Sequence, residues 1–376
     1  DYTAWYDMIR KLQPGAVISV KGPDVRWVGN EGGYGRTTEW SVIPLPESPE
    51  AHTWPDKQQQ DLGSRAKLTP GSFLWWYPAE VNTSILNGWF WSADKRAKSP
   101  AELVDYFYRS VGRNGNMLLS LAPDTRGLIP DDQLASLHQM AEVVRNTFAH
   151  DLATGATFAT DSANPAHAAA LAHDGNLDTW WEAAPGQTAA TFTVTLPAPV
   201  TFDVVSLQEA VAQRSQRTES FVIETWSAAA SAWTTPATVD ELTTVGYKRL
   251  ARLASPVTTD RVRIRITGSR LEPTLAEVGL FKQSLPLAPQ IAERNRDGSV
   301  AVTHPHALPI IYTLDGSEPN AGSPVYRGPI PLPEGGTVNA AVLTTDRRVG
   351  LVAGKTIVGV APTHWTATAT PSGDAT

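Results

Sequence analysis

The sequence has 376 residues, and at roughly 150 residues per domain this length predicts two or three domains. Hydrophobic residues make up 41% of the chain and charged residues 18%, which excludes a disordered polymer, and no run reaches the roughly 20 apolar residues of a membrane span. The net charge of -7 without a basic stripe excludes nucleic acid as an expected partner, and the absence of cysteine excludes disulfide and thiolate chemistry.

Up to about residue 150 the pattern alternates between helix and strand. Amphipathic or capped segments predict three helices, and short apolar runs predict three buried strands. The helices are expected at 4–12, 99–111 and 129–148, and the strands at 16–20, 72–77 and 116–123. Strand-then-helix units with long loops are typical of a (β/α) barrel, which has eight strands, so we expect only part of a barrel.

From about residue 151 the helical periodicity gives way to short alternating runs separated by turn residues. This pattern predicts a β-sandwich, and the Pro-rich segment 285–290 predicts a linker to a third block of short strands. We therefore expect domains at 1–150, 151–284 and 285–354, with 355–376 as a tail or the start of a truncated further domain.

The densest group of charged and aromatic residues is the segment GPDVRWVGNEGGYGRTTEW, residues 22–40. It follows the predicted strand 16–20, and in a (β/α) barrel the loops after the strands carry the catalytic groups. Glycines on both sides of Glu31 permit unusual backbone angles, so this carboxyl is a candidate general acid. A solvated loop whose charges pair locally remains an equally good interpretation of the composition.

The run KLQPGAVISVKGPDVRWVGNEGGYGRTTEWSVIP, together with segments 75–91 and 110–130, strongly resembles the α-L-fucosidase family of retaining glycoside hydrolases. It is similar to the branch that cleaves α-1,3/1,4-linked fucose, and the resemblance covers residues 1–150. It implies the C-terminal half of a TIM-like barrel, an exo-acting fucosidase without a catalytic cofactor, and fucosylated oligosaccharides or glycoconjugates as substrates. It also implies that Glu31 is the general acid/base.

The same resemblance implies substrate-binding residues around Glu31 and on the next strand-end loop. The alternative for Glu80 is a structural ion pair, and for Trp89 and Trp91 it is a place in the core. The predicted substrate-binding residues are Trp27, Tyr34, Arg36, Glu39, Trp40, Glu80 and Trp91.

A retaining glycosidase needs two carboxyls about 5 Å apart, and the family's nucleophilic aspartate belongs to a WFDG-like strand end. That segment is expected upstream of Asp1; Asp1 and Asp7 are rejected as nucleophiles because they lie at the start of, or within, a predicted helix and not at a strand end. The missing N-terminal half of the barrel is therefore an expected partner, and this chain alone is expected to be inactive.

The second block resembles a discoidin-type sandwich, as found in carbohydrate-binding modules, through the segments AHDGNLDTWW (172–181) and AEVGLF (276–281). The resemblance implies a structural Ca²⁺ bound by hard oxygen ligands. The alternative is an Asx-rich turn without metal. The predicted ligands are Asp174, Asn176, Asp178, Thr179 and Glu277. Segments 208–221 and 246–249 are expected to contact the barrel.

The third block resembles the Ig-like C-terminal domain of chitobiases and hexosaminidases through IYTLDGSEPNAGSPVY, residues 311–326. These features together predict a bacterial enzyme that is secreted, periplasmic or bound to the cell surface. The competing hypothesis is a non-catalytic carbohydrate-binding or adhesion protein built from the two β domains. Such a protein would have no need of the loop 22–40.

Overall fold

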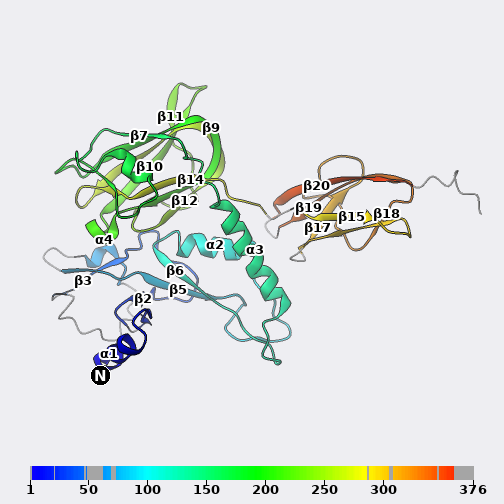
Figure 1. The fold of residues 1–376 in the computed structure, drawn as a ribbon, viewed down its shortest axis with the longest axis horizontal. Coiled ribbons are helices and arrows are strands. Elements are labelled where there is room, and N and C mark those ends of the chain that lie inside the picture. The colour runs from blue at the N-terminus through cyan, green and yellow to red at the C-terminus, as the bar shows by residue number, and fades with distance from the viewer. Residues whose placement is uncertain are drawn as a thin grey trace, which may run out of the picture. The chain divides into compact units, whose positions relative to one another are not determined.

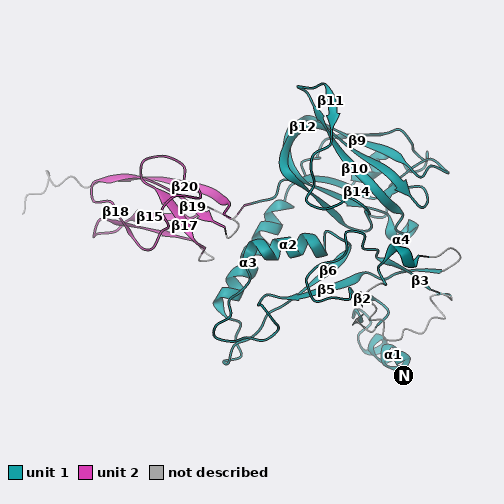
Figure 2. Ribbon diagram, turned by 180° about the vertical axis from the view of Figure 1, so that it is seen from behind, with its two compact units in different colours: residues 1–284 teal, residues 285–376 magenta. Residues whose placement is uncertain are grey.

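The computed structural model describes residues 2–20, 22–45, 48, 62–68, 73–285, 288–304, 308–344 and 347–359. These residues form two compact units, 1–284 and 285–376, which are coloured separately in Figure 2. Residues 286–287 of the predicted linker and 360–376 of the predicted tail lie outside the described residues. In the described part of the chain, no helix is long and apolar enough to cross a membrane.

The first part of unit 1 is built on a four-stranded parallel sheet with the order β1-β2-β5-β6 (Figure 1). Its strands are β1 (Ser19–Val20), β2 (Val25–Trp27), β5 (Ala79–Ser84) and β6 (Gly115–Ser120). The accompanying helices are α1 (Tyr2–Leu12), α2 (Pro100–Ser110) and α3 (Asp131–Thr147), with a 3-10 turn, η1, at Arg65–Lys67. This part is a partial (β/α) barrel, as the sequence predicts.

Helix α2 confirms the helix predicted at 99–111. Ser99 is the N-cap and forms a capping box with Glu102, and Pro100 occupies the first turn. The buried side of the helix carries Val104 and Tyr108, which pack in one apolar cluster with Val143 of α3. Local capping and a periodic apolar face therefore suffice to place this helix.

Two of the predicted strands differ from the structure. Segment 72–77 forms β4 (Phe73–Trp76), which pairs antiparallel with β3 (Val42–Leu45) outside the parallel sheet, and Phe73, Leu74 and Trp76 are exposed. The parallel strand is instead β5, which carries Glu80, a residue predicted to lie on a strand-end loop. Segment 16–20 is strand only at β1, and Val17 is 67% exposed. Apolar runs of this length do not distinguish a buried strand from an exposed hairpin.

The second part of unit 1 is an antiparallel β-sandwich. Its main sheet has the order β11-β10-β12-β9-β14, β7 also pairs with β9, and β13 pairs with β8. Inward-facing side chains, among them Trp181, Phe192 and Phe202, form one continuous core. The strands are β7 (Thr157–Thr160), β8 (Trp181–Glu182), β9 (Ala190–Gln208), β10 (Thr218–Ser227), β11 (Ala232–Thr234), β12 (Arg249–Ser269), β13 (Thr274–Leu275) and β14 (Glu277–Phe281). Short helical turns are η2 (Ala169–His173) and α4 (Val211–Arg214).

Unit 2 is a small Ig-like sandwich of two three-stranded sheets around its own apolar core. One sheet has the order β15-β16-β18 and the other β17-β19-β20. The strands are β15 (Gln290–Arg294), β16 (Ser299–Thr303), β17 (Ile310–Thr313), β18 (Ile330–Pro331), β19 (Gly335–Leu343) and β20 (Val349–Val358).

Candidate active site

The loop that follows β2 is fixed by the parallel pairing of β2 with β5. Trp27 is in register with Glu80, and the Val28 amide donates to the Glu80 carbonyl at 2.9 Å. Gly33 has φ of +75°, and a Cβ there would lie 3.0 Å from Tyr106 and 3.1 Å from Thr83. Glycine is required at this position, both for its backbone angle and for the close approach of the loop to α2 and β5.

Glu31 lies in this loop with its side chain exposed to solvent. Its Oε2 accepts a hydrogen bond from Trp89 Nε1 at 2.9 Å. Three residues later Tyr34 is 40% exposed, and the Arg109 guanidinium lies 4.9 Å from its ring centroid. A carboxyl at the end of a barrel strand, accessible and oriented by an indole N–H, can exchange a proton with a bound ligand.

Polar side chains of β5 lie beside Trp27. Trp27 Nε1 donates to Asn82 Oδ1 at 2.8 Å, and Glu80 Oε2 accepts from Ser19 Oγ at 2.5 Å. Glu80 lies within strand β5, and the prediction that it belongs to a strand-end loop is wrong. Asn82 was missed by the sequence analysis, although it stands two residues after Glu80 and so shares its face of the strand.

The two tryptophans of the segment 87–91 have different surroundings. Trp89 contacts Glu31, whereas Trp91 is partly buried and packs against the cluster of Ile85 and Leu86. Among the described residues, the structure thus brings Trp89 to Glu31 and packs Trp91 against the apolar cluster of Ile85 and Leu86.

Glu39 and Trp40 lie beneath the loop, 0% and 1% exposed. Glu39 Oε1 pairs with Arg26, which is also 0% exposed, and Glu39 Oε2 accepts from the Arg36 amide at 2.9 Å and from Arg36 Nη1 at 3.2 Å. These contacts occupy both carboxylate oxygens. Glu39 and Trp40 therefore form the buried base of the loop, and the half-buried Arg36 pairs with Glu39, whereas Glu31 faces solvent.

Residues 174–179, the predicted calcium loop, form a hydrogen-bonded turn. Thr179 Oγ1 donates to Asp174 Oδ2 at 2.7 Å and to the Asn176 carbonyl at 2.8 Å, and the Asn176 amide donates to Asp174 Oδ1 at 2.9 Å, which are the contacts of an Asx-rich turn. Asp178 instead accepts from Gln213 Nε2 at 2.9 Å. The structure therefore joins three of the five predicted ligands and directs Asp178 elsewhere.

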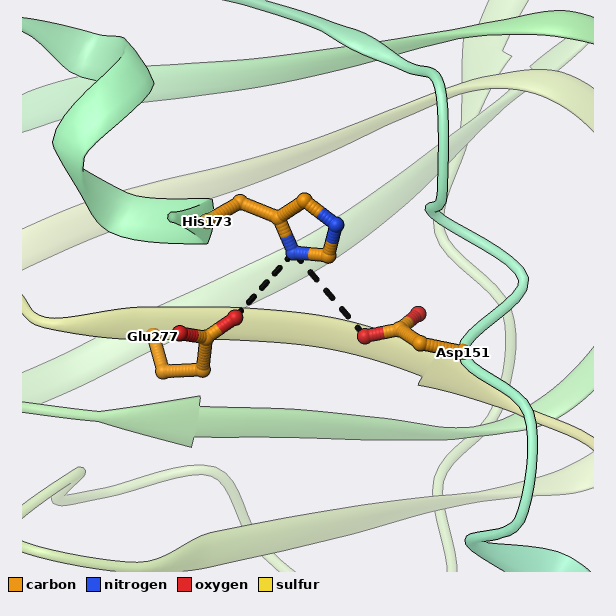
Figure 3. Close-up of side chains that lie close together, drawn as sticks. All are labelled: Asp151, His173 and Glu277. Atoms are coloured by element: carbon orange, nitrogen blue, oxygen red, sulfur yellow. Dashed lines mark ion pairs between the residues drawn. The ribbon is translucent and has the colours of Figure 1, made fainter. Parts of the chain in front are cut away.

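Glu277 belongs to a different cluster, with Asp151 and His173 (Figure 3). His173 Nδ1 lies 3.1 Å from Glu277 Oε1, 3.9 Å from Asp151 Oδ2 and 2.8 Å from the Val278 carbonyl. The hydrogen bond to Glu277 raises the pKa of His173, and burial raises the pKa of Asp151. Nothing in the spacing of these three residues along the chain had indicated the cluster.

Comparison with protein families gives three matches along the chain. Residues 52–147 match the alpha-L-fucosidase family, 156–277 match the F5/8 type C domain, and 293–352 match the chitobiase/beta-hexosaminidase C-terminal domain. The first match begins beyond the loop that carries Glu31.

Individual relatives agree. Alpha-L-fucosidase 1 of Arabidopsis thaliana is 30% identical over 285 residues, covering 74% of this chain and 54% of the plant protein. The chain spans about half the length of the two plant relatives that it matches, 54% and 53%. Among solved structures, SpGH29 has a TM-score of 0.64 at 28% identity and covers 75% of this chain and 60% of its own. The Ruminococcus gnavus GH29 fucosidase E1_10125 in complex with fucose has a TM-score of 0.61 at 24% identity, covering 76% and 57%, and shows likeness of fold.

Proposed function

Because the chain is a partial catalytic domain of the alpha-L-fucosidase family followed by an F5/8 type C sandwich and an Ig-like domain, we propose that it is the C-terminal part of a retaining, exo-acting α-L-fucosidase. The substrates are oligosaccharides or glycoconjugates that carry α-1,3- or α-1,4-linked fucose. The observation that carries this proposal is Glu31, an exposed carboxyl after β2 that is hydrogen-bonded to Trp89.

In this mechanism Glu31 protonates the oxygen of the leaving sugar and later takes a proton from the attacking water. Trp89 orients the carboxyl through its indole N–H. Glu80 and Asn82 on β5, together with Trp27, supply hydrogen-bonding groups and an aromatic face for the sugar.

We also propose that the nucleophilic carboxylate comes from residues that precede this chain in a longer protein. The described residues form a four-stranded parallel sheet, whereas a closed barrel has eight strands. Without a nucleophile the covalent fucosyl-enzyme cannot form. Residues 1–376 alone should therefore hydrolyse nitrophenyl fucoside no faster than the same chain with Glu31→Gln. Turnover typical of a glycosidase from this chain would refute the proposal.

The test of the whole function is Glu31→Gln in the full-length protein. General acid catalysis contributes about 10²–10⁴-fold, so kcat/KM on an oligosaccharide should fall by that factor. An activated aryl fucoside needs little protonation and should lose much less, and azide should rescue the deglycosylation step. The matched control is Glu318→Gln, which changes an exposed carboxyl of unit 2.

Equal activity of Glu31→Gln and wild type on the oligosaccharide would remove Glu31 from the mechanism. Binding of fucosylated glycans by the full-length protein without any hydrolysis would instead favour the carbohydrate-binding or adhesion role.

A further inference from the structure

The part of the loop that follows Glu31 is held by side chains of the sandwich. The Thr37 carbonyl accepts hydrogen bonds from Thr243 Oγ1 at 2.7 Å and from Arg249 Nη1 at 2.9 Å. The Ser41 amide and hydroxyl donate to Gln216 Oε1 at 2.9 and 3.0 Å. Residues 37–41 are thus attached to a part of the chain about two hundred positions away in sequence.

Gln216 is the junction of these contacts and is 3% exposed. Besides accepting from Ser41, its Nε2 donates to the Glu39 carbonyl at 3.3 Å and to Thr244 Oγ1 at 2.7 Å. A glutamine amide offers two donors and one acceptor oxygen, and here all of them have partners. A buried polar network in which every member is satisfied fixes one arrangement, because any displacement leaves a buried group unpaired.

Arg249 makes the second attachment and is 1% exposed. Its guanidinium donates to carbonyl oxygens, of Thr37 through Nη1 and of Glu241 through Nη2. Burial lowers the pKa of Arg249 to about 10. A desolvated cation bonded to carbonyls is costly to move, so it holds the Thr37 carbonyl in place.

Between Thr37 and Glu31 the loop is held by residues of the partial barrel. Arg113 Nη1 donates to the Gly35 carbonyl at 2.8 Å, and the Gly35 amide donates to the Arg109 carbonyl at 2.8 Å. Asn30, the residue before Glu31, donates through Nδ2 to the Tyr34 carbonyl at 3.1 Å. Hydrogen bonds at Gly35 and Tyr34 therefore hold the backbone between Glu31 and Thr37, and the peptide chain itself connects this stretch to the attachment at Thr37.

From this geometry we infer that the sandwich positions the acid loop, with Gln216, Thr243 and Arg249 as positioning residues for Glu31. The inference rests on the proposed role of Glu31. A general acid must stay within hydrogen-bond reach of the leaving oxygen, about 2.6–3.2 Å, and a misplacement of about 1 Å can reduce the rate by about 100-fold. The F5/8 type C domain would then act in catalysis through the loop that it holds.

The kinetic test compares Gln216→Met and Arg249→Met with Arg252→Met in the full-length protein. Arg252 is the matched control, because it crosses the same interface but pairs with Asp105 of α2 at 2.8 Å and not with the loop. The measured quantity is the ratio of kcat/KM on an oligosaccharide to kcat/KM on an activated aryl fucoside. We expect both loop variants to lower this ratio by roughly 10–100-fold and the control to leave it within about twofold.

A milder pair guards against variants that fail to fold. Thr243→Val removes the hydroxyl that bonds Thr37, whereas Thr243→Ser retains it. The ratio should fall in the valine variant and recover in the serine variant, and a loss of packing alone would not produce that recovery. Equal ratios in the two variants, or an equal fall in Arg252→Met, would overturn the inference.

A second measurement is independent of catalysis. Hydrogen–deuterium exchange of the peptide covering residues 28–41 should be faster in Gln216→Met and Arg249→Met than in wild type or Arg252→Met. Unchanged exchange would refute the attachment even if the enzyme proves to be a fucosidase. Faster exchange combined with no effect of Glu31→Gln would leave the attachment standing and refute the proposed function.

Discussion

Removal of one partner of the buried ion pair of Arg26 and Glu39 should cost substantial stability. Both side chains are 0% exposed, and Arg26 also donates to the carbonyls of Trp40 at 2.9 Å and Tyr77 at 3.2 Å. The chain passes so close at Gly63 that a Cβ there would lie 1.8 Å from Glu39 Oε1. Glu39→Leu removes the carboxylate and leaves the guanidinium buried without its counter-charge.

Removing one partner of a buried pair typically costs about 3–5 kcal/mol, because the remaining charge stays desolvated. For a unit of this size, at about 2–4 °C per kcal/mol, the melting temperature should fall by roughly 6–20 °C. Replacing both partners by apolar residues, as in Arg26→Met with Glu39→Leu, removes the uncompensated charge. The double variant should therefore recover much of the lost stability.

Scanning calorimetry of the full-length protein measures the effect, and the transition of unit 2, which has its own core, serves as an internal reference. A shift confined to the larger unit is expected. If Glu39→Leu melts within about 2 °C of wild type but loses affinity for the substrate, the reasoning is wrong. Glu39 would then have the substrate-binding role that the loop sequence predicts.

The remaining predictions concern the sandwich and the acid. EDTA should lower the melting temperature of the sandwich if Ca²⁺ binds only the folded state, and Asp174→Ala should abolish the response; no EDTA shift in wild type would remove the site. The pKa of His173 is raised, so protonated His173 stabilises the folded state fully below a pH of about 6.5, and this stability is lost as the pH rises through the folded-state pKa. Melting curves recorded in EDTA over a series of pH values should show this loss. Glu277→Gln should flatten the dependence, because it removes the carboxylate that pairs with His173. Trp89→Phe removes the donor to Glu31 and should lower kcat/KM on an oligosaccharide by roughly 2–10-fold, whereas an unchanged value would show that the contact is dispensable.

Local sequence signals determined much of the architecture. The start of α2 is marked by Ser99, Pro100 and Glu102, because a capping box is formed by residues three apart. The short alternating runs after residue 151 predict the sandwich for the same reason, since the period of two is a property of each strand by itself. Glu31 could be singled out because glycines, aromatics and a family motif surround it along the chain.

Only the tertiary structure decided which neighbours in sequence share a surface. Glu31 and Glu39 stand eight positions apart in one loop, yet Glu31 is exposed and Glu39 is 0% exposed. The difference arises because Arg26 forms a buried ion pair with Glu39. In addition, Gln216, 177 positions away in sequence, donates a hydrogen bond to the Glu39 carbonyl. A run such as 72–77 was assigned to the wrong sheet because apolar composition does not specify the partner strand. Burial depends on which distant segments pack together, and the spacing of residues within one segment does not specify those partners.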